Sequence, residues 1–164
     1  MIIAIENNLQ KGIQLLESIS DEAYADTSLG PYNASIGCHV RHVLDVYSCI
    51  LKGVASKKID LTTRERNIEV EQQTSLGINY FNSVIDQLKN LHQHNDLSEL
   101  LEVTDDLGLG NETATYTLGS VLMQAQSHTT HHYASIGYII YQLKIALPTI
   151  DFGFNPSTKK KAKV

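Results

Sequence analysis

The chain has 164 residues, of which 42% are hydrophobic and 19% charged, with a formal net charge of −5. This composition indicates one globular domain and excludes a disordered or collagen-like chain. The sequence contains no run of 18 apolar residues, so no membrane-spanning helix is predicted. The net negative charge argues against a nucleic-acid binder. The N-terminal residues lack the features of a secretory signal, so we expect a cytoplasmic protein.

Apolar residues spaced three and four positions apart predict the first helix over residues 2–19. Turn-forming residues over 20–34 predict a loop. Ser35 is a suitable N-cap for a second helix that runs to about residue 55. Residues 56–72 are polar and charged, which indicates a loop or a short helical turn.

The second half of the chain begins with a third predicted helix, over residues 73–93. The segments LLEVTD and TATYTL then flank GLGNE and predict a short β-hairpin. A fourth helix is predicted over 119–147, where Pro148 stops it. We therefore predict an all-α fold, a four-helix bundle with a short β-hairpin before the last helix. Residues 1–147 form the bundle, and residues 148–164 form an irregular tail that ends in a lysine cluster.

The last predicted helix carries three histidines in the sequence HTTHH. On a helical wheel His132 lies about 30° and His128 about 70° from the centre of the apolar stripe, whereas His131 lies about 130° away. His128 and His132 are one turn apart, so their imidazoles can share a metal ion. Two imidazoles hold a divalent ion weakly, so the site needs a third ligand from another helix.

The second predicted helix offers His39 and His42 in the sequence HVRH. The helical wheel favours His39 as the inward ligand, although a site at the edge of a bundle can use His42. The alternative is that these histidines are hydrogen-bonded interface residues that hold no metal. The charged residues that follow this helix are either a solvated surface or a polar rim to the site. They are Asp60, Arg64, Arg66, Glu69 and Glu71.

The segments SIGCHVRHVLDVY and SHTTHHYASIGY together resemble the DinB/YfiT-like superfamily of metal-dependent enzymes with a four-helix-bundle fold. The resemblance covers about residues 2–147. It implies a metal triad of His42, which precedes Val-Leu-Asp, together with His128 and His132. His39 then becomes a reserve ligand or an outer partner of the site. Asp45 and Gln124, each one turn from a ligand, are candidates for orienting an imidazole.

The same resemblance implies a divalent metal, most often nickel or zinc, with open positions for water or a small-molecule substrate. Relatives include transferases that use low-molecular-weight thiols. We therefore expect a metal-dependent transferase or hydrolase, with no catalytic residue assigned, and a homodimer. The alternatives are a metal-binding or stress-related helical protein without turnover, and a structural bundle whose histidines hold no metal.

Overall fold

The computed structural model describes residues 1–158, so the lysine cluster at the end of the predicted tail lies outside the described residues. The protein is mostly helical with a small sheet. No helix within residues 1–158 is long and apolar enough to cross a membrane. The helices are α1 (Ile2–Leu16), α2 (Asp21–Ala25), α3 (Ile36–Gly53), the 3-10 helix η1 (Ile68–Glu71), α4 (Thr74–His94) and α5 (Leu118–Gln142).

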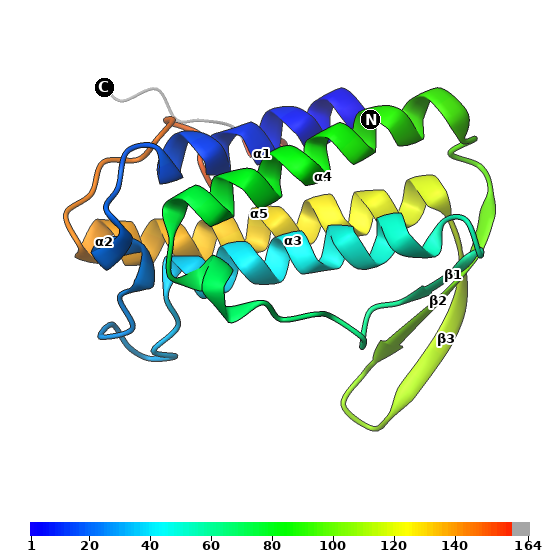
Figure 1. Cartoon of the computed structure of the whole chain (residues 1–164), viewed down its shortest axis with the longest axis horizontal. Coiled ribbons are helices and arrows are strands. Elements are labelled where there is room, and N and C mark those ends of the chain that lie inside the picture. Colours follow the sequence, from blue (N-terminus) through cyan, green and yellow to red (C-terminus); the bar gives the residue numbers. More distant parts are fainter. Residues whose placement is uncertain (159–164) are drawn as a thin grey trace.

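Four long helices, α1, α3, α4 and α5, lie side by side (Figure 1). Helix α1 packs on α4, and α3 packs on both α4 and α5. The inward faces bury one continuous core, whose largest fully buried side chains are Tyr24, Tyr47, Phe81 and Tyr133. The four helices are those that the apolar periodicity predicts, because each buries one stripe of its surface.

The sheet lies at one end of the helices (Figure 1). Its strands are β1 (Lys58–Asp60), β2 (Leu100–Asp106) and β3 (Asn111–Thr117), in the order β1-β2-β3. Strands β2 and β3 form the predicted antiparallel hairpin, with Val103 opposite Ala114. The expectation of a loop or helical turn over 56–72 missed β1, which pairs parallel to β2. Three residues with a single buried side chain, Ile59, carry too little pattern to be read as a strand.

Two further details differ from the sequence-based prediction. The predicted loop 20–34 contains α2, whose N-cap Ser20 accepts a hydrogen bond from the backbone N–H of Ala23. Helix α5 ends at Gln142 rather than at residue 147, since the chain turns into the left-handed region at Lys144, with φ of 59°. Pro148 therefore lies beyond the end of the helix and is not the residue that terminates it.

The segment after α5 packs on the helices although it has no regular structure. Phe152 is buried and its ring stacks on that of Tyr133, with centroids 4.6 Å apart. Gly153 adopts a φ of 74°, and a Cβ atom there would meet the backbone of Ala134 at 2.8 Å. Residues 152–153 are thus fitted closely against α5.

Candidate metal centre

Helix α3 presents His39 and His42 from its first two turns. Its first turn is fixed by Ser35, whose hydroxyl accepts a hydrogen bond from the backbone N–H of Cys38 at 3.0 Å, as predicted. The 3-10 helix η1 packs closely against this turn, because a Cβ atom on Gly37 would lie 2.2 Å from the carbonyl oxygen of Glu71. The Ser35 cap and the packing of η1 therefore fix the start of α3, and they fix the position of the two histidines with it.

Helix α5 presents His128 and His132, which are one turn apart on the side that faces α3. A buried hydrogen bond joins the two helices at this level: the Tyr47 hydroxyl lies 3.3 Å from the Thr129 hydroxyl, which accepts its proton. Thr129 also donates to the carbonyl oxygen of Ala125 at 2.8 Å. Because Thr129 is adjacent to His128, its contact with Tyr47 fixes the position of α5 along α3 at the level of the histidines.

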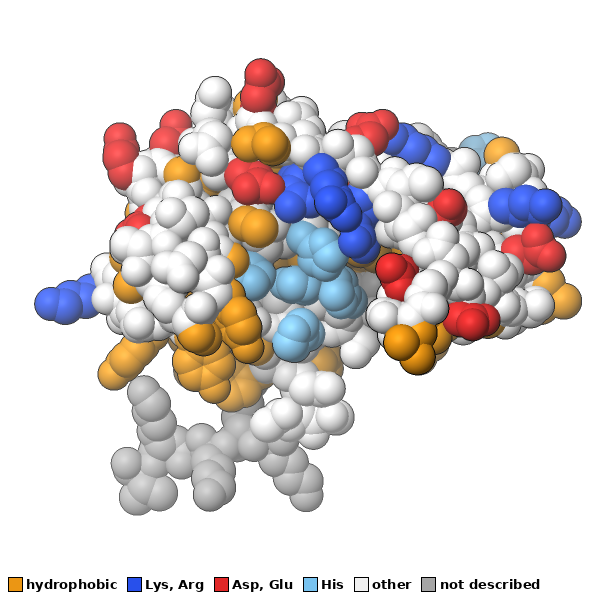
Figure 2. Space-filling view, turned by 90° about the horizontal axis from the view of Figure 1, so that it is seen from below, with side chains coloured by type: hydrophobic (Ala, Val, Ile, Leu, Met, Phe, Trp, Pro, Cys, Tyr) orange, Lys and Arg blue, Asp and Glu red, His pale blue; other side chains and the backbone are white. Residues whose placement is uncertain are grey.

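Three imidazoles converge between these helices. The Nε2 atom of His128 lies 2.8 Å from Nε2 of His42 and 3.1 Å from Nε2 of His132. All three rings offer a nitrogen within 4.8 Å of the others, and all three side chains are half-buried. The histidines gather on one face of the molecule, with cationic side chains directly beside them (Figure 2).

The donor set fits a divalent cation. A neutral imidazole has one N–H and one lone pair, so three converging Nε2 atoms cannot all be satisfied by hydrogen bonds to each other. Nitrogen ligands 2.0–2.1 Å from a tetrahedral ion are roughly 3.3 Å apart, close to the observed separations. A single ion at the centre would therefore satisfy three lone pairs at once.

Burial keeps these histidines neutral. It is the main cause that lowers the pKa of His42 to about 4, and the nearby His128, Arg64 and Arg41 lower it further. Burial, followed by the surrounding histidines, lowers the pKa of His132 to about 3. The pKa of His128 is also lowered, mainly by burial. Since metal binding requires the unprotonated ring, the site is prepared for a cation at neutral pH.

The sequence was compared with models of known protein families. A family model described as the DinB family matches residues 5–162. The chain belongs to the DinB family. The match includes both histidine-bearing helices and confirms the family resemblance of the two histidine segments. A comparison with curated proteins gave no match for this DinB-family chain.

In this DinB-family protein His39 lies outside the group of three, contrary to the choice that the helical wheel favours. Its Nδ1 atom lies 2.8 Å from Nδ1 of His132. For Nε2 of His132 to direct a lone pair toward the centre, the proton of that ring must be on Nδ1. The Nδ1–H of His132 then donates to Nδ1 of His39, which fixes both the tautomer and the ring orientation.

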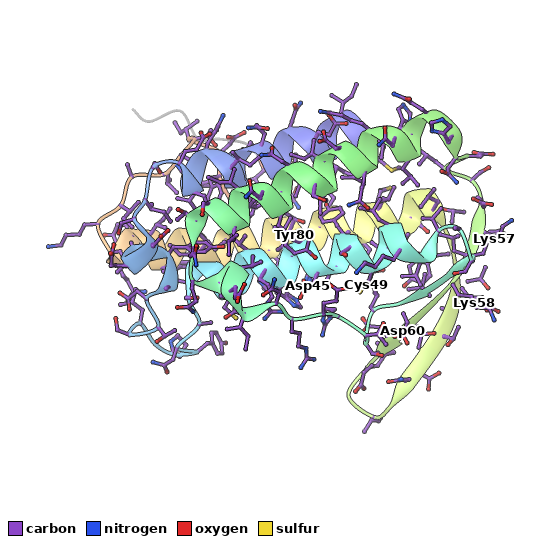
Figure 3. The ribbon with its side chains drawn as sticks, in the orientation of Figure 1. Asp45, Cys49, Lys57, Lys58, Asp60 and Tyr80 are labelled. Atoms are coloured by element: carbon purple, nitrogen blue, oxygen red, sulfur yellow. The ribbon has the colours of Figure 1, made fainter. Side chains whose placement is uncertain are left out.

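Asp45 and Gln124 make no hydrogen bond to an imidazole within the described structure. Asp45 is buried and accepts hydrogen bonds from Arg41 at 2.9 Å and from the Tyr80 hydroxyl at 3.1 Å. Figure 3 labels Asp45 on α3 and Tyr80 on the neighbouring α4. Arg41 also donates to Glu71 at 2.6 Å. Asp45 thus ties α3 to α4, while Gln124 is exposed at the edge of the site.

The charged cluster that follows α3 divides into separate roles. Glu71 pairs with Arg41, and Asp60 accepts hydrogen bonds from Thr62. Arg64 lines a cavity together with His42 and His128, so the polar-rim interpretation holds for this residue. Sequence spacing carried no signal that would single out Arg64, since the segment that delivers it has no regular structure.

A larger hollow of about 290 Å³ lies on another face of α3 and contains Cys49 and Tyr80 (Figure 3). Burial raises the pKa of the Cys49 thiol, so this cysteine is a poor candidate for a nucleophile. The chemistry that the described residues can perform is therefore concentrated at the histidines.

Proposed function

We propose that the protein is a metal-dependent enzyme in which His42, His128 and His132 hold one divalent ion, in a four-helix bundle of DinB type. The observation that carries the proposal is the convergence of three Nε2 atoms, separated by 2.8 and 3.1 Å in two of the three pairs. Nickel and zinc suit a set of imidazole ligands. Bound there, such an ion acts as a Lewis acid that lowers the pKa of a water or thiol ligand.

The reaction that we infer is transfer of a small thiol to an electrophilic carbon. The thiol gives up its proton to solvent, its sulfur forms a bond to the carbon, and the leaving group departs with the electron pair of the broken bond. His132 keeps its orientation throughout, because its Nδ1–H donates to His39. The half-buried histidines leave an approach for the substrates from the open face.

Two hollows flank the histidines and support a reaction with two substrates. The smaller, of about 120 Å³, is lined by His42 and His128. The other, of about 300 Å³, is lined by His39 and by the apolar side chains of Leu29, Tyr32 and Tyr138. A polar thiol suits the first, and an apolar electrophile suits the second.

The test uses tag-free protein, since a histidine tag would bind metal itself. Metal content is measured after purification, and conjugation of a panel of small thiols to 1-chloro-2,4-dinitrobenzene is followed with nickel, zinc or no metal. We expect metal-dependent conjugation that His128→Ala abolishes and His131→Ala retains. Bound metal with no conjugation by any thiol would instead support hydrolysis or a metal-binding protein without turnover. Absence of metal binding would refute the proposal.

A further inference from the structure

Beside the histidines lies a cavity of about 120 Å³ with an uneven distribution of charge. His42 and His128 form one part of its lining, and aliphatic side chains of α3 and α5 form its walls. Its other polar groups are Arg64, Asp105 and Gln124. Because one water molecule takes about 30 Å³, the cavity has room for a ligand fragment of only a few heavy atoms.

Arg64 is the unusual member of this lining. Its Nε atom is buried and has no hydrogen-bond partner. Within residues 1–158 its guanidinium forms no ion pair: Glu65 pairs with Lys52, and Glu71 pairs with Arg41. A guanidinium remains charged at any physiological pH, and a buried donor is normally satisfied by a partner. A cavity with a charged and unsatisfied donor is suited to an anionic ligand.

The sheet holds Arg64 in this position. The backbone N–H of Leu61 donates to the carbonyl oxygen of Thr104 at 2.9 Å, which extends the pairing of β1 with β2. The Thr62 hydroxyl donates to Asp60 at 2.6 Å, and the Leu61 side chain is buried. The chain is therefore anchored two to three residues before Arg64, so that its guanidinium is presented to the histidines from outside the helices.

We propose that Arg64 binds a carboxylate of the substrate, so that the preferred thiol carries a carboxylate a few bonds from its sulfur. The proposal rests on the proposed function, because the sulfur must reach the three-histidine centre while the carboxylate meets the guanidinium. The planar fork of arginine matches a carboxylate with two parallel N–H donors. The carboxylate of Asp105 lines the same cavity, so it disfavours ligands with a second negative charge and selects a monoanion over a phosphate.

The test compares two thiols that differ only in charge. Cobalt-loaded protein is titrated with 3-mercaptopropionate and with 3-mercapto-1-propanol, and binding is followed by the sulfur-to-cobalt absorption band. We expect the acid to bind at least tenfold more tightly than the alcohol. Arg64→Gln should remove this preference and leave the affinity for the alcohol unchanged. Arg64→Lys should keep part of it, since lysine retains the charge but not the fork.

Lys52→Gln is the matched control, because it removes an exposed cation of the same region that does not line the cavity. If it lowers the preference as much as Arg64→Gln does, general electrostatic attraction explains the result and the proposal is wrong. The proposal is also overturned if both thiols bind to the wild type with equal affinity.

A second measurement separates this proposal from the proposed function. Binding of propionate to metal-free protein is measured by ligand-observed NMR in the wild type and in Arg64→Gln. Propionate binding to the wild type but not to Arg64→Gln supports the role of Arg64. If, in that case, neither thiol changes the cobalt spectrum, only the proposed thiol transfer is refuted. Equal binding to both proteins, or to neither, overturns the role of Arg64.

Discussion

The substitution His128→Ala isolates the contribution of the central imidazole. His128 is the member of the group whose Nε2 atom lies within 3.1 Å of both other Nε2 atoms. Without it, two ligands remain on different helices, and neither belongs to a one-turn pair. Loss of an outer partner of a metal ligand typically costs 10–100-fold in affinity. Loss of a ligand itself should therefore weaken nickel or zinc binding by more than about 100-fold.

The same substitution should have little effect on the fold. His128 is half-buried at the edge of the core, so its truncation should lower the free energy of unfolding of the metal-free protein by about 1–2 kcal/mol. For a chain of this length that corresponds to a fall in Tm of roughly 2–8 °C. Leu122→Ala should lower Tm by roughly 4–20 °C, because Leu122 is fully buried and the cavity costs about 2–5 kcal/mol, yet it should leave metal binding intact.

The assay combines metal titration calorimetry with thermal unfolding of four proteins: wild type, His128→Ala, Leu122→Ala and His131→Ala. His131 is the matched control, since it is an exposed histidine on the same helix and outside the group of three. If His128→Ala retains wild-type affinity for the metal, the assignment of the centre is refuted. If it unfolds the metal-free protein, the histidines have a structural role that the proposed enzyme does not require.

Three further predictions follow from the site and its surroundings. The metal-free protein should lose stability as the pH falls from about 6.5 toward 4, because the folded-state pKa of His42 is about 4 and the unfolded chain takes up more protons in this range. Thermal melts against pH should show a smaller loss in His42→Ala, in which His132, with a folded-state pKa of about 3, still contributes. Asp45→Ala should lower the free energy of unfolding by about 3–5 kcal/mol in chemical denaturation, because it leaves Arg41 and Tyr80 without their buried partner. It should lower metal affinity less than tenfold in calorimetry, and a larger loss would make Asp45 an orienting partner of the centre. Light scattering should give twice the 18.2 kDa mass of the chain if the homodimer expected from the family resemblance forms, and a monomer at micromolar concentration would contradict it.

Local sequence patterns predicted those elements in which the same residue spacing recurs several times within one segment. Each long helix repeats its apolar spacing over several turns, and His128 and His132 are neighbours on α5 because they are one turn apart. The choice between His39 and His42 depends on how α3 is rotated against α5, which a single helical wheel does not determine. The family resemblance supplied that information, and the structure agrees in bringing His42 to the pair.

The features that the sequence did not predict depend on pairing between distant segments. Strand β1 exists because Ile59 lies opposite Val103, more than forty positions away, and neither segment alone indicates a parallel pair. The position of Arg64 depends on that pairing and on the anchoring of Leu61 to Thr104. A sequence with several charged residues between two helices gives no reason to select one of them, so only the folded structure distinguishes Arg64 from Arg66.

The proposed site draws its metal ligands from the helices and its anion-binding residue from a segment next to the sheet. The three imidazoles come from α3 and α5, which are joined by buried packing and by the contact of Thr129 with Tyr47, so their geometry is set by the core. Arg64 comes from an irregular segment whose start is anchored to the sheet. If Arg64 binds the ligand as proposed, substitutions in that segment should change which ligand is bound without disturbing the histidines, whereas a change in the core beneath α3 and α5 should shift the imidazoles.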